Sequence, residues 1–181
     1  MKLFVSILSL LIVISCSRQK KDTYRSRKNY DSVATKETAE NVTIEYTDSG
    51  LRKATIKTPL MVGVKKVKEP YIEMPKGIHV EFFTADGKVE SYLTAEYAIS
   101  YTNKKTIVLK RKVEVLNVKG DTLNTEEMTW NQNTGRIVSE KFVVIKTKTQ
   151  TIWGDGMNSD QSFTDWEILN VRGTINKEQK K

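Results

Sequence analysis

The sequence predicts an all-β domain whose strands form a stretched, curved pair of sheets with an apolar interior and two free ends. Three observations predict it. Apolar and polar residues alternate from residue 42 onward, turn-forming residues recur at nearly even spacing, and a unit of two strands is repeated about two and a half times. After residue 41, no apolar stripe with the spacing of a helix persists for three turns.

Residues 1–15 are predicted to be a signal peptide of the lipoprotein type. Lys2 is followed by a run from residue 3 to residue 14 that is apolar apart from two serines. A spanning helix needs ~20 apolar residues, so this run is too short to cross a bilayer comfortably and has the length of a secretory signal. The tetrad Val13-Ile14-Ser15-Cys16 resembles the bacterial lipoprotein cleavage box. We therefore expect Cys16 to carry lipid as the first residue of the mature protein; the alternative is an incidental cysteine or a short uncleaved anchor.

Residues 16–41 are predicted to be a flexible basic tether, and residues 177–181 a basic tail. The formal net charge of the chain is +8, to which residues 18–36 contribute +5 and the tail +2. Residues 37–176 carry equal numbers of basic and acidic side chains. A domain that binds nucleic acid holds a basic surface of its own, so we expect no nucleic-acid partner. The cations of the tether either favour an anionic lipid surface or belong to a solvated spacer.

Strands are expected wherever apolar and polar residues alternate. Residues 42–46 and 78–82 each place three apolar side chains on one face, and residues 93–101 place five on one face. Residues 107–115 continue the pattern, with Arg111 breaking the apolar row at a bulge or a sheet edge. The turn signals between strands are Asp48-Ser49-Gly50, Asp86-Gly87, Asn103-Lys104, Lys119-Gly120-Asp121, Asn133-Thr134-Gly135 and Thr149-Gln150.

A weak repeat underlies this order of strands. Residues 93–98 are echoed thirty residues later at 123–128, and again twenty-nine residues later at 152–157. A hydrophobic strand lies between each pair of echoes, at 106–116 and 136–146. Repeats of this kind bury a face only by stacking on their neighbours. We therefore expect one continuous β-domain over residues 42–176.

The sequence offers no credible active site, and we expect neither an enzyme nor a bound cofactor or metal. The chain has one cysteine and one histidine, which removes chemistry that needs two imidazoles or a cysteine cluster. Glu126 and Glu127 point to opposite faces of a strand, so they cannot act together on one substrate. Asp155, Asp160 and Asp165 lack the alternating ligand pattern of a calcium loop.

Three further features each have a functional and a structural interpretation. His79 is expected to be exposed or to have a single partner. Lys110-Arg111-Lys112 is either a contact for lipid or saccharide phosphates or, as we favour, a set of solvated strand charges that deter edge pairing. Trp130, Trp153 and Trp166 are expected to anchor the core or its rim, with ligand stacking as the alternative.

Five segments, taken in their order along the chain, resemble a known family. They are Tyr46-Thr47-Asp48-Ser49-Gly50, Lys53-Ala54-Thr55-Ile56, Leu93-Thr94-Ala95-Glu96-Tyr97-Ala98, Val113-Glu114-Val115 and Leu123-Asn124-Thr125-Glu126. From residue 45 to about residue 170 the chain resembles LptC, the periplasmic component of the lipopolysaccharide export machinery, and more loosely the periplasmic bridge proteins. The resemblance implies an open, twisted β-jelly roll that shelters the acyl chains of lipid A. It also implies a passive relay, whose ends pair edge to edge with an inner-membrane ABC transporter and with a periplasmic bridge protein.

Ten apolar residues are the candidate lipid groove, taken from the inward rows of the expected strands: Ile78, Val80, Phe82, Leu93, Tyr97, Ile99, Ile107, Leu109, Val113 and Val115. Gly50 is the candidate contact for the transporter. Each buried CH₂ of an acyl chain contributes about 0.8 kcal/mol, so partial cover of one chain already gives several kcal/mol. The alternative is a closed sandwich, filled by its own side chains, that serves as a structural or adaptor lipoprotein for a protein or glycan partner.

Two features depart from the family pattern. Many members have an uncleaved transmembrane helix where this chain has Cys16, and Thr149-Gln150 replaces a glycine that often precedes the last repeat strand. The first departure concerns the anchor, and the second concerns the C-terminal contact surface. We expect the protein at the periplasmic side of the inner membrane, anchored through its N-terminus, with sorting to the outer membrane as the alternative.

Overall fold

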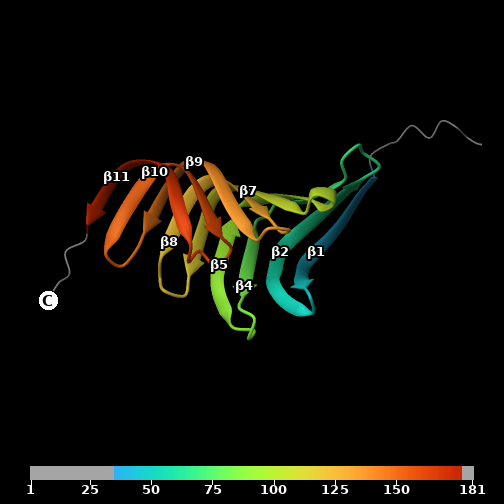
Figure 1. The fold of residues 1–181 in the computed structure, drawn as a ribbon. Coiled ribbons are helices and arrows are strands. Elements are labelled where there is room, and N and C mark those ends of the chain that lie inside the picture. The colour runs from blue at the N-terminus through green and yellow to red at the C-terminus, as the bar shows by residue number, and fades with distance from the viewer. Residues whose placement is uncertain (1–34, 177–181) are drawn as a thin grey trace, which may run out of the picture. The chain divides into compact units, whose positions relative to one another are not determined.

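The computed structural model describes residues 35–176, which form one antiparallel sheet of eleven strands (Figure 1). The strands are β1 (Thr35–Asp48), β2 (Leu51–Lys65), β3 (Tyr71–Met74), β4 (Ile78–Phe83), β5 (Val89–Ala95), β6 (Tyr97–Tyr101), β7 (Thr106–Asn117), β8 (Thr122–Asn131), β9 (Arg136–Lys146), β10 (Gln150–Asp160) and β11 (Trp166–Asn176), with one short 3-10 helix, η2 (Thr102–Lys104). The predicted all-β, jelly-roll fold is confirmed for this part of the chain.

The sheet forms two layers because its long strands run through both. The first half of β7 pairs with β6, and its second half pairs with β5. Strand β2 changes partners in the same way, from β4 at residues 54–57 to β3 at residues 62–64. We call the layer that contains β3 and β6 layer A, and the layer that contains β4 and β5 layer B. In Figure 1 the strands follow one another from β11 at one end of the described domain to β1 at the other.

Long strands bend where they pass from one layer to the other. In β7 the register shifts between Lys110 and Val113, and Arg111 and Lys112 have positive φ angles of 64° and 46°. Strands β8 and β10 have register shifts of their own, in β10 around Gly156. Bulges of this kind leave residues out of the ladder and turn the strand sharply. The irregularity predicted at Arg111 is confirmed as a bulge.

At the bends, the long strands run on from one layer into the other. On the side of the roll opposite the bends, the strands of each layer end in turns. We call the line along which the turns of layer A meet those of layer B the seam. Hydrogen bonds cross it: the Tyr46 hydroxyl of β1 donates to the carbonyl of Gln132, which follows β8, at 3.0 Å. The roll is therefore covalently continuous on one side and closed by side-chain contacts on the other.

The core lies between the layers and is built from the inward side chains of both. In β7, buried and more exposed residues alternate on either side of the bulge, as a half-buried strand requires. Trp130 of β8 is fully buried in layer A and meets Phe82 of β4, in layer B, edge to face at 4.8 Å between ring centroids. The ring of Tyr46 approaches Trp130 at 6.1 Å in the same manner. These aromatic contacts join the layers near the β1 end.

The described domain begins earlier than the sequence predicted. Strand β1 starts at Thr35 and pairs with β2 from Thr35↔Lys65 to Asp48↔Leu51, so residues 35–41 are strand and not tether. Almost all of these residues are exposed on both faces, which leaves no apolar alternation to reveal the strand. The predicted signal peptide, Cys16, the rest of the tether and the tail 177–181 lie outside the described residues.

Candidate functional site

The candidate site is the apolar interior between the two layers. Eight of the ten predicted groove residues lie there, each at most 4% exposed: Ile78, Val80, Phe82, Leu93, Ile107, Leu109, Val113 and Val115. Ile107 and Leu109 come from layer A and the other six from layer B. They pack against the rest of the core, so in this structure the interior is filled by side chains of the protein itself.

Tyr97 and Ile99 do not belong to that inward row, and their placement there was wrong. The predicted strand over 93–101 is interrupted at Glu96, whose backbone N–H donates to the carbonyl of Arg111 at 3.0 Å. The interruption shifts the alternation of inward and outward side chains by one residue. Ala98 is therefore buried, while Tyr97 and Ile99 are half-buried on the other face. The Tyr97 hydroxyl donates to Glu73 at 3.2 Å; partial burial and the Glu73 carboxylate raise the pKa of Tyr97.

Two open pockets reach the rim of the interior at the bends. One, of about 520 Å³, lies between β1, β2 and β4 and includes the core residues Ile78 and Ala95 in its wall. The other, of about 680 Å³, lies over β7, β8 and β9 and includes Val113 beside Lys112, Lys141 and the exposed ring of Phe142. Both combine apolar floors with polar and charged rims, which suits an amphiphile better than a purely polar solute.

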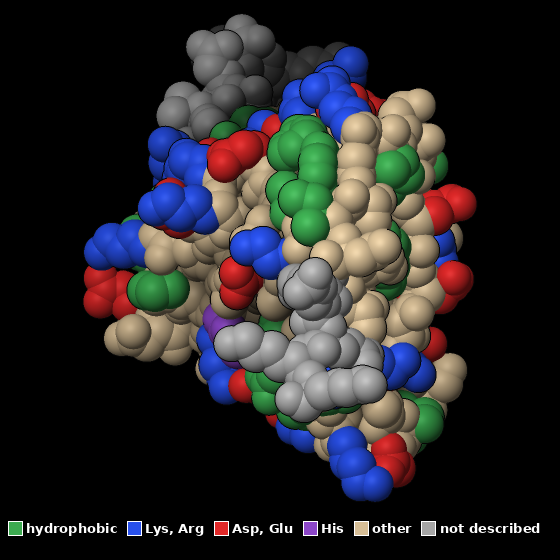
Figure 2. Space-filling view, turned by 90° about the vertical axis from the view of Figure 1, so that its left-hand side faces the viewer, with side chains coloured by type: hydrophobic (Ala, Val, Ile, Leu, Met, Phe, Trp, Pro, Cys, Tyr) green, Lys and Arg blue, Asp and Glu red, His purple; other side chains and the backbone are tan. Residues whose placement is uncertain are grey.

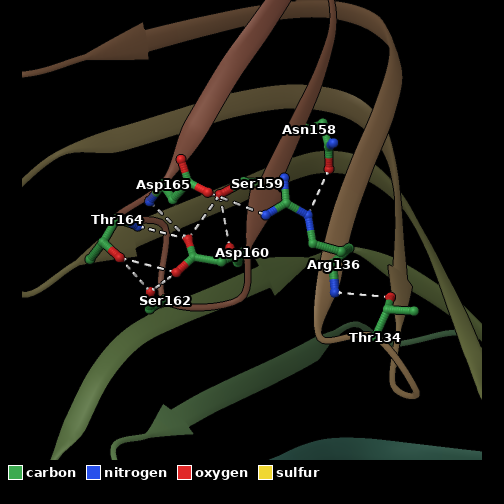
Figure 3. Close-up of polar contacts among 8 residues, drawn as sticks. All are labelled: Thr134, Arg136, Asn158, Ser159, Asp160, Ser162, Thr164 and Asp165. Carbon is green, nitrogen blue, oxygen red and sulfur yellow. Dashed lines mark hydrogen bonds and ion pairs between the residues drawn. The ribbon is translucent and has the colours of Figure 1, made fainter.

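The loop between β10 and β11 closes the seam and was missed by the sequence reasoning (Figure 3). The Asp160 carboxylate accepts hydrogen bonds from the backbone N–H groups of Thr164 (2.9 Å) and Asp165 (3.0 Å) and from the hydroxyls of Ser162 and Thr164. Partial burial alone would raise the pKa of Asp160, but these hydrogen bonds outweigh it and hold that pKa below its ordinary value. The sequence signal was present, because Asp followed by Ser and Thr in this spacing favours such side-chain-capped turns.

Neighbouring strands support the same loop. Arg136 at the start of β9 donates from Nε to Asn158 at 3.0 Å and pairs with Asp165 at 3.5 Å. On the layer B side, partial burial and the charge of Asp160 raise the pKa of Glu90 in β5. Asp160 and Asp165 therefore have structural partners, whereas Asp155 pairs with Arg172 of β11.

The two ends of the sheet are unpaired within residues 35–176. Strand β1 pairs only with β2, and β11 only with β10. Strand β11 carries three exposed apolar side chains, Leu169, Val171 and Ile175, each more than half exposed. Figure 2 views the β11 end, where hydrophobic side chains appear as separate groups among backbone and charged side chains. Gly50 lies in the exposed β1–β2 turn with a φ angle of 78° and open space around it.

The remaining charged candidate residues lie beside carboxylates of neighbouring strand residues. Lys110 pairs with Glu127 at 3.0 Å, and Lys112 pairs with Glu96 at 2.5 Å. This pairing favours the structural interpretation of the basic cluster. His79 is partly exposed and faces Glu81 at 3.6 Å. Within the part of the chain that the structure describes, no group of three His, Cys, Asp or Glu side chains could hold a metal ion.

The tryptophans divide between core and rim. Trp130 is a core residue, and its indole Nε1–H has no hydrogen-bond partner among residues 35–176. Trp153 lies against Gly173 of the neighbouring strand, and Trp166 is half-buried against Phe163. All three therefore have packing partners within the described residues.

The fold and its site define a class of protein: over residues 35–176, a β-jelly roll with an apolar interior between two layers and a free strand edge at each end. Residues 3–176 match the family model described as lipopolysaccharide-assembly, LptC-related. The chain belongs to the LptC family, as the resemblance in its sequence indicated. The family has a role in lipopolysaccharide transport and is a transport component, not an enzyme family. A search of curated proteins found no match.

Members of the family are in general associated with the periplasm and the inner membrane. In residues 35–176, no helix has the length and apolar character needed to cross a membrane.

Proposed function

We propose that the protein is a membrane-anchored periplasmic relay that shelters acyl chains of lipopolysaccharide between its two layers. In this role it receives the lipid from an inner-membrane ABC transporter and passes it to a periplasmic bridge protein. The protein hydrolyses nothing; a partner ATPase supplies the energy. The observation that carries the proposal is the apolar interior, which is lined by both layers and extends towards free edges at both ends.

The interior suits acyl chains because it is continuous and almost wholly hydrocarbon. Leucine, isoleucine, valine, methionine and aromatic side chains of eight strands line it, and the charged side chains stand on the outer faces and rims. A bound acyl chain would gain about 0.8 kcal/mol for each methylene removed from water. The sugars and phosphates of the headgroup would remain in water, near the polar rims of the two pockets.

The free edges supply the means of docking. An unpaired strand offers a row of backbone donors and acceptors, to which a strand of another protein can add. We assign one edge, β1 or β11, to each partner, with Gly50 in the turn next to β1 as the contact near the transporter. On β11 the exposed Val171 and Ile175 add apolar area beside the backbone hydrogen bonds.

The relay predicts that photocrosslinking to lipopolysaccharide depends on the face of the strand. A diazirine analogue of leucine placed at position 109, which is fully buried, should form an adduct with lipopolysaccharide in living cells. The same analogue at positions 97 and 99, on the opposite face, should form adducts at no more than about a tenth of that yield, since contact falls off within one layer of side chains.

The filled interior favours one competing function, an adaptor lipoprotein with a permanently closed sandwich. If the protein with the analogue at Leu109 is folded and at the membrane but yields no adduct, that adaptor is the better description. Equal adduct yields at all three positions would indicate surface contact with membrane lipid and would also count against the relay.

The anchor of the relay is proposed to be lipid on Cys16, which lies outside the described residues. Several acyl chains on one residue exceed the two-chain requirement for stable attachment. Replacing Cys16 with serine should therefore move most of the protein from the membrane fraction to the soluble periplasmic fraction, as measured by immunoblotting of fractionated cells. Retention of the Cys16→Ser variant in the membrane would show instead that an uncleaved N-terminal segment holds it.

A further inference from the structure

The β10–β11 loop inserts an aromatic side chain into the interior from the seam. Phe163 is 1% exposed although it lies in a loop, and its ring stacks on Trp166 at 6.0 Å. Its φ angle is 53°, a left-handed conformation that is uncommon for a bulky residue without a structural or functional reason. The ring is part of the same buried cluster as the predicted groove residues. Phe163 thus occupies apolar space between the layers.

Few bonds hold this loop to layer B. The hydroxyl of Ser91 donates to the carbonyl of Gln161 at 2.6 Å, and the amide of Asn117 donates to the carbonyl of Phe163 at 2.9 Å. The strands that flank the loop, β10 and β11, are by contrast held by ladders of backbone hydrogen bonds. Local opening begins where backbone pairing is sparse, so the loop opens at a lower free energy than these strands.

The loop also has its own internal structure, so that it can move as a unit. Asp160 binds the backbone N–H groups of Thr164 and Asp165 and the hydroxyl of Ser162. These bonds lie within residues 160–165 and do not depend on layer B. Breaking the two bonds from Ser91 and Asn117 would therefore release the loop from layer B without unravelling it. On the layer A side it would stay attached, because the backbone N–H of Gln161 donates to the carbonyl of Gly135 at 3.0 Å and Asp165 pairs with Arg136.

From these contacts we infer that an acyl chain binds in the place of Phe163, entering through the seam as the 161–165 loop lifts away from β5 and β7. The inference rests on the proposed function and adds the entry point and the residue that the ligand displaces. Side chains of the protein fill the interior, so an entering chain must replace one of them. Methylenes of the chain then cover the apolar surface that the phenyl ring leaves.

Hydrogen–deuterium exchange on the full chain, held in amphipol, tests this inference. Lipopolysaccharide should speed exchange of the amides of residues 161–165 about ten-fold or more, while slowing exchange in β5 and β7. Deacylated lipopolysaccharide should change neither segment. A phospholipid with the same chain length is the third arm; if it acts like lipopolysaccharide, the site accepts acyl chains in general, and the displacement of the loop stands.

The contrary outcomes separate the inference from the proposed function. Slower exchange in β5 and β7 with unchanged exchange in residues 161–165 would overturn the displacement of Phe163 but leave the relay intact. No change anywhere with any acylated lipid would overturn both.

Variants provide an independent measurement. Phe163→Ala should reach half-saturation at about ten-fold lower lipopolysaccharide concentration, because the ring no longer has to be displaced. Phe83→Ala removes the same kind of ring at a buried position outside the core cluster, where the Arg52 guanidinium covers it; it is the matched control and should not tighten binding. If Phe163→Ala does not fold, Ser91→Ala loosens the loop alone and should tighten binding about two- to five-fold. Equal or weaker binding in the loop variants relative to Phe83→Ala would refute the inference.

Discussion

Replacing Trp130 with alanine is expected to lower the free energy of unfolding by about 3–5 kcal/mol, the range found for large buried aromatic residues. Trp130 is fully buried and joins the layers through its contacts with Phe82 and Tyr46. Truncation leaves a cavity lined by rigid strands of both layers, which can collapse only partly. Denaturant unfolding followed by far-UV circular dichroism measures the loss.

Trp130→Phe is the matched variant for this prediction. It keeps a ring between the layers and removes the indole N–H, which is unpaired within the described part of the chain and whose burial carries a desolvation penalty of about 1–3 kcal/mol. We therefore expect Trp130→Phe to lose less than half as much stability as Trp130→Ala. Similar losses in the two variants would mean that the indole N–H has a partner and contributes to stability.

Gly154→Ala is expected to detach β11 from the sheet. A Cβ atom at Gly154 would overlap the carbonyl oxygen of Asn170 and lie 2.7 Å from Cγ2 of Ile168, both on β11. Backbone atoms of a paired strand cannot yield as a flexible side chain does, so the pairing must open there. Overpacking of this kind costs about 1–3 kcal/mol in global stability. Hydrogen exchange should show the amides of β11 exposed, with the β4 and β5 ladder unchanged.

Gly63→Ala is the control for that prediction. It lies in β2, and its added Cβ would meet only the carbonyl of Glu37, at an ordinary 3.8 Å. We expect a change within about 0.5 kcal/mol and normal protection of β11. In the relay, Gly154→Ala should also weaken capture of whichever partner adds to the β11 edge, and Gly63→Ala should not. Normal protection of β11 in Gly154→Ala would contradict the close approach of β10 and β11.

The alternation of apolar residues predicted most of the interior correctly. The rows in β4 and β7 lie inside as expected, and the charged interruption at Arg111 is a bulge that lets β7 pass between layers. The row through β5 and β6 was wrong beyond Ala95, because the break at Glu96 depends on a hydrogen bond to Arg111 on another strand. Alternation within one segment carries no information on such a contact.

Contacts between distant residues also explain the features that were missed. The first residues of β1 form a strand because β2 offers them a ladder, and not because their side chains alternate. The loop that closes the seam is tied to Ser91 and Asn117, which precede their partners by 70 and 46 residues. The sequence around Asp160 indicates the Asx-type turn of this loop, but it does not indicate that the loop lies over the interior.

By itself, the amino-acid sequence determined that residues beyond 42 form β-strands with apolar inner faces, because strand periodicity and turn chemistry are local properties of the chain. It also carried the repeat and the motifs that identify the LptC family. Only the tertiary structure decided how strands bend between two layers, which edges stay unpaired and what fills the space between them. Those features depend on packing and hydrogen bonds between segments far apart in sequence. The sequence of one segment does not specify where its distant partner will lie.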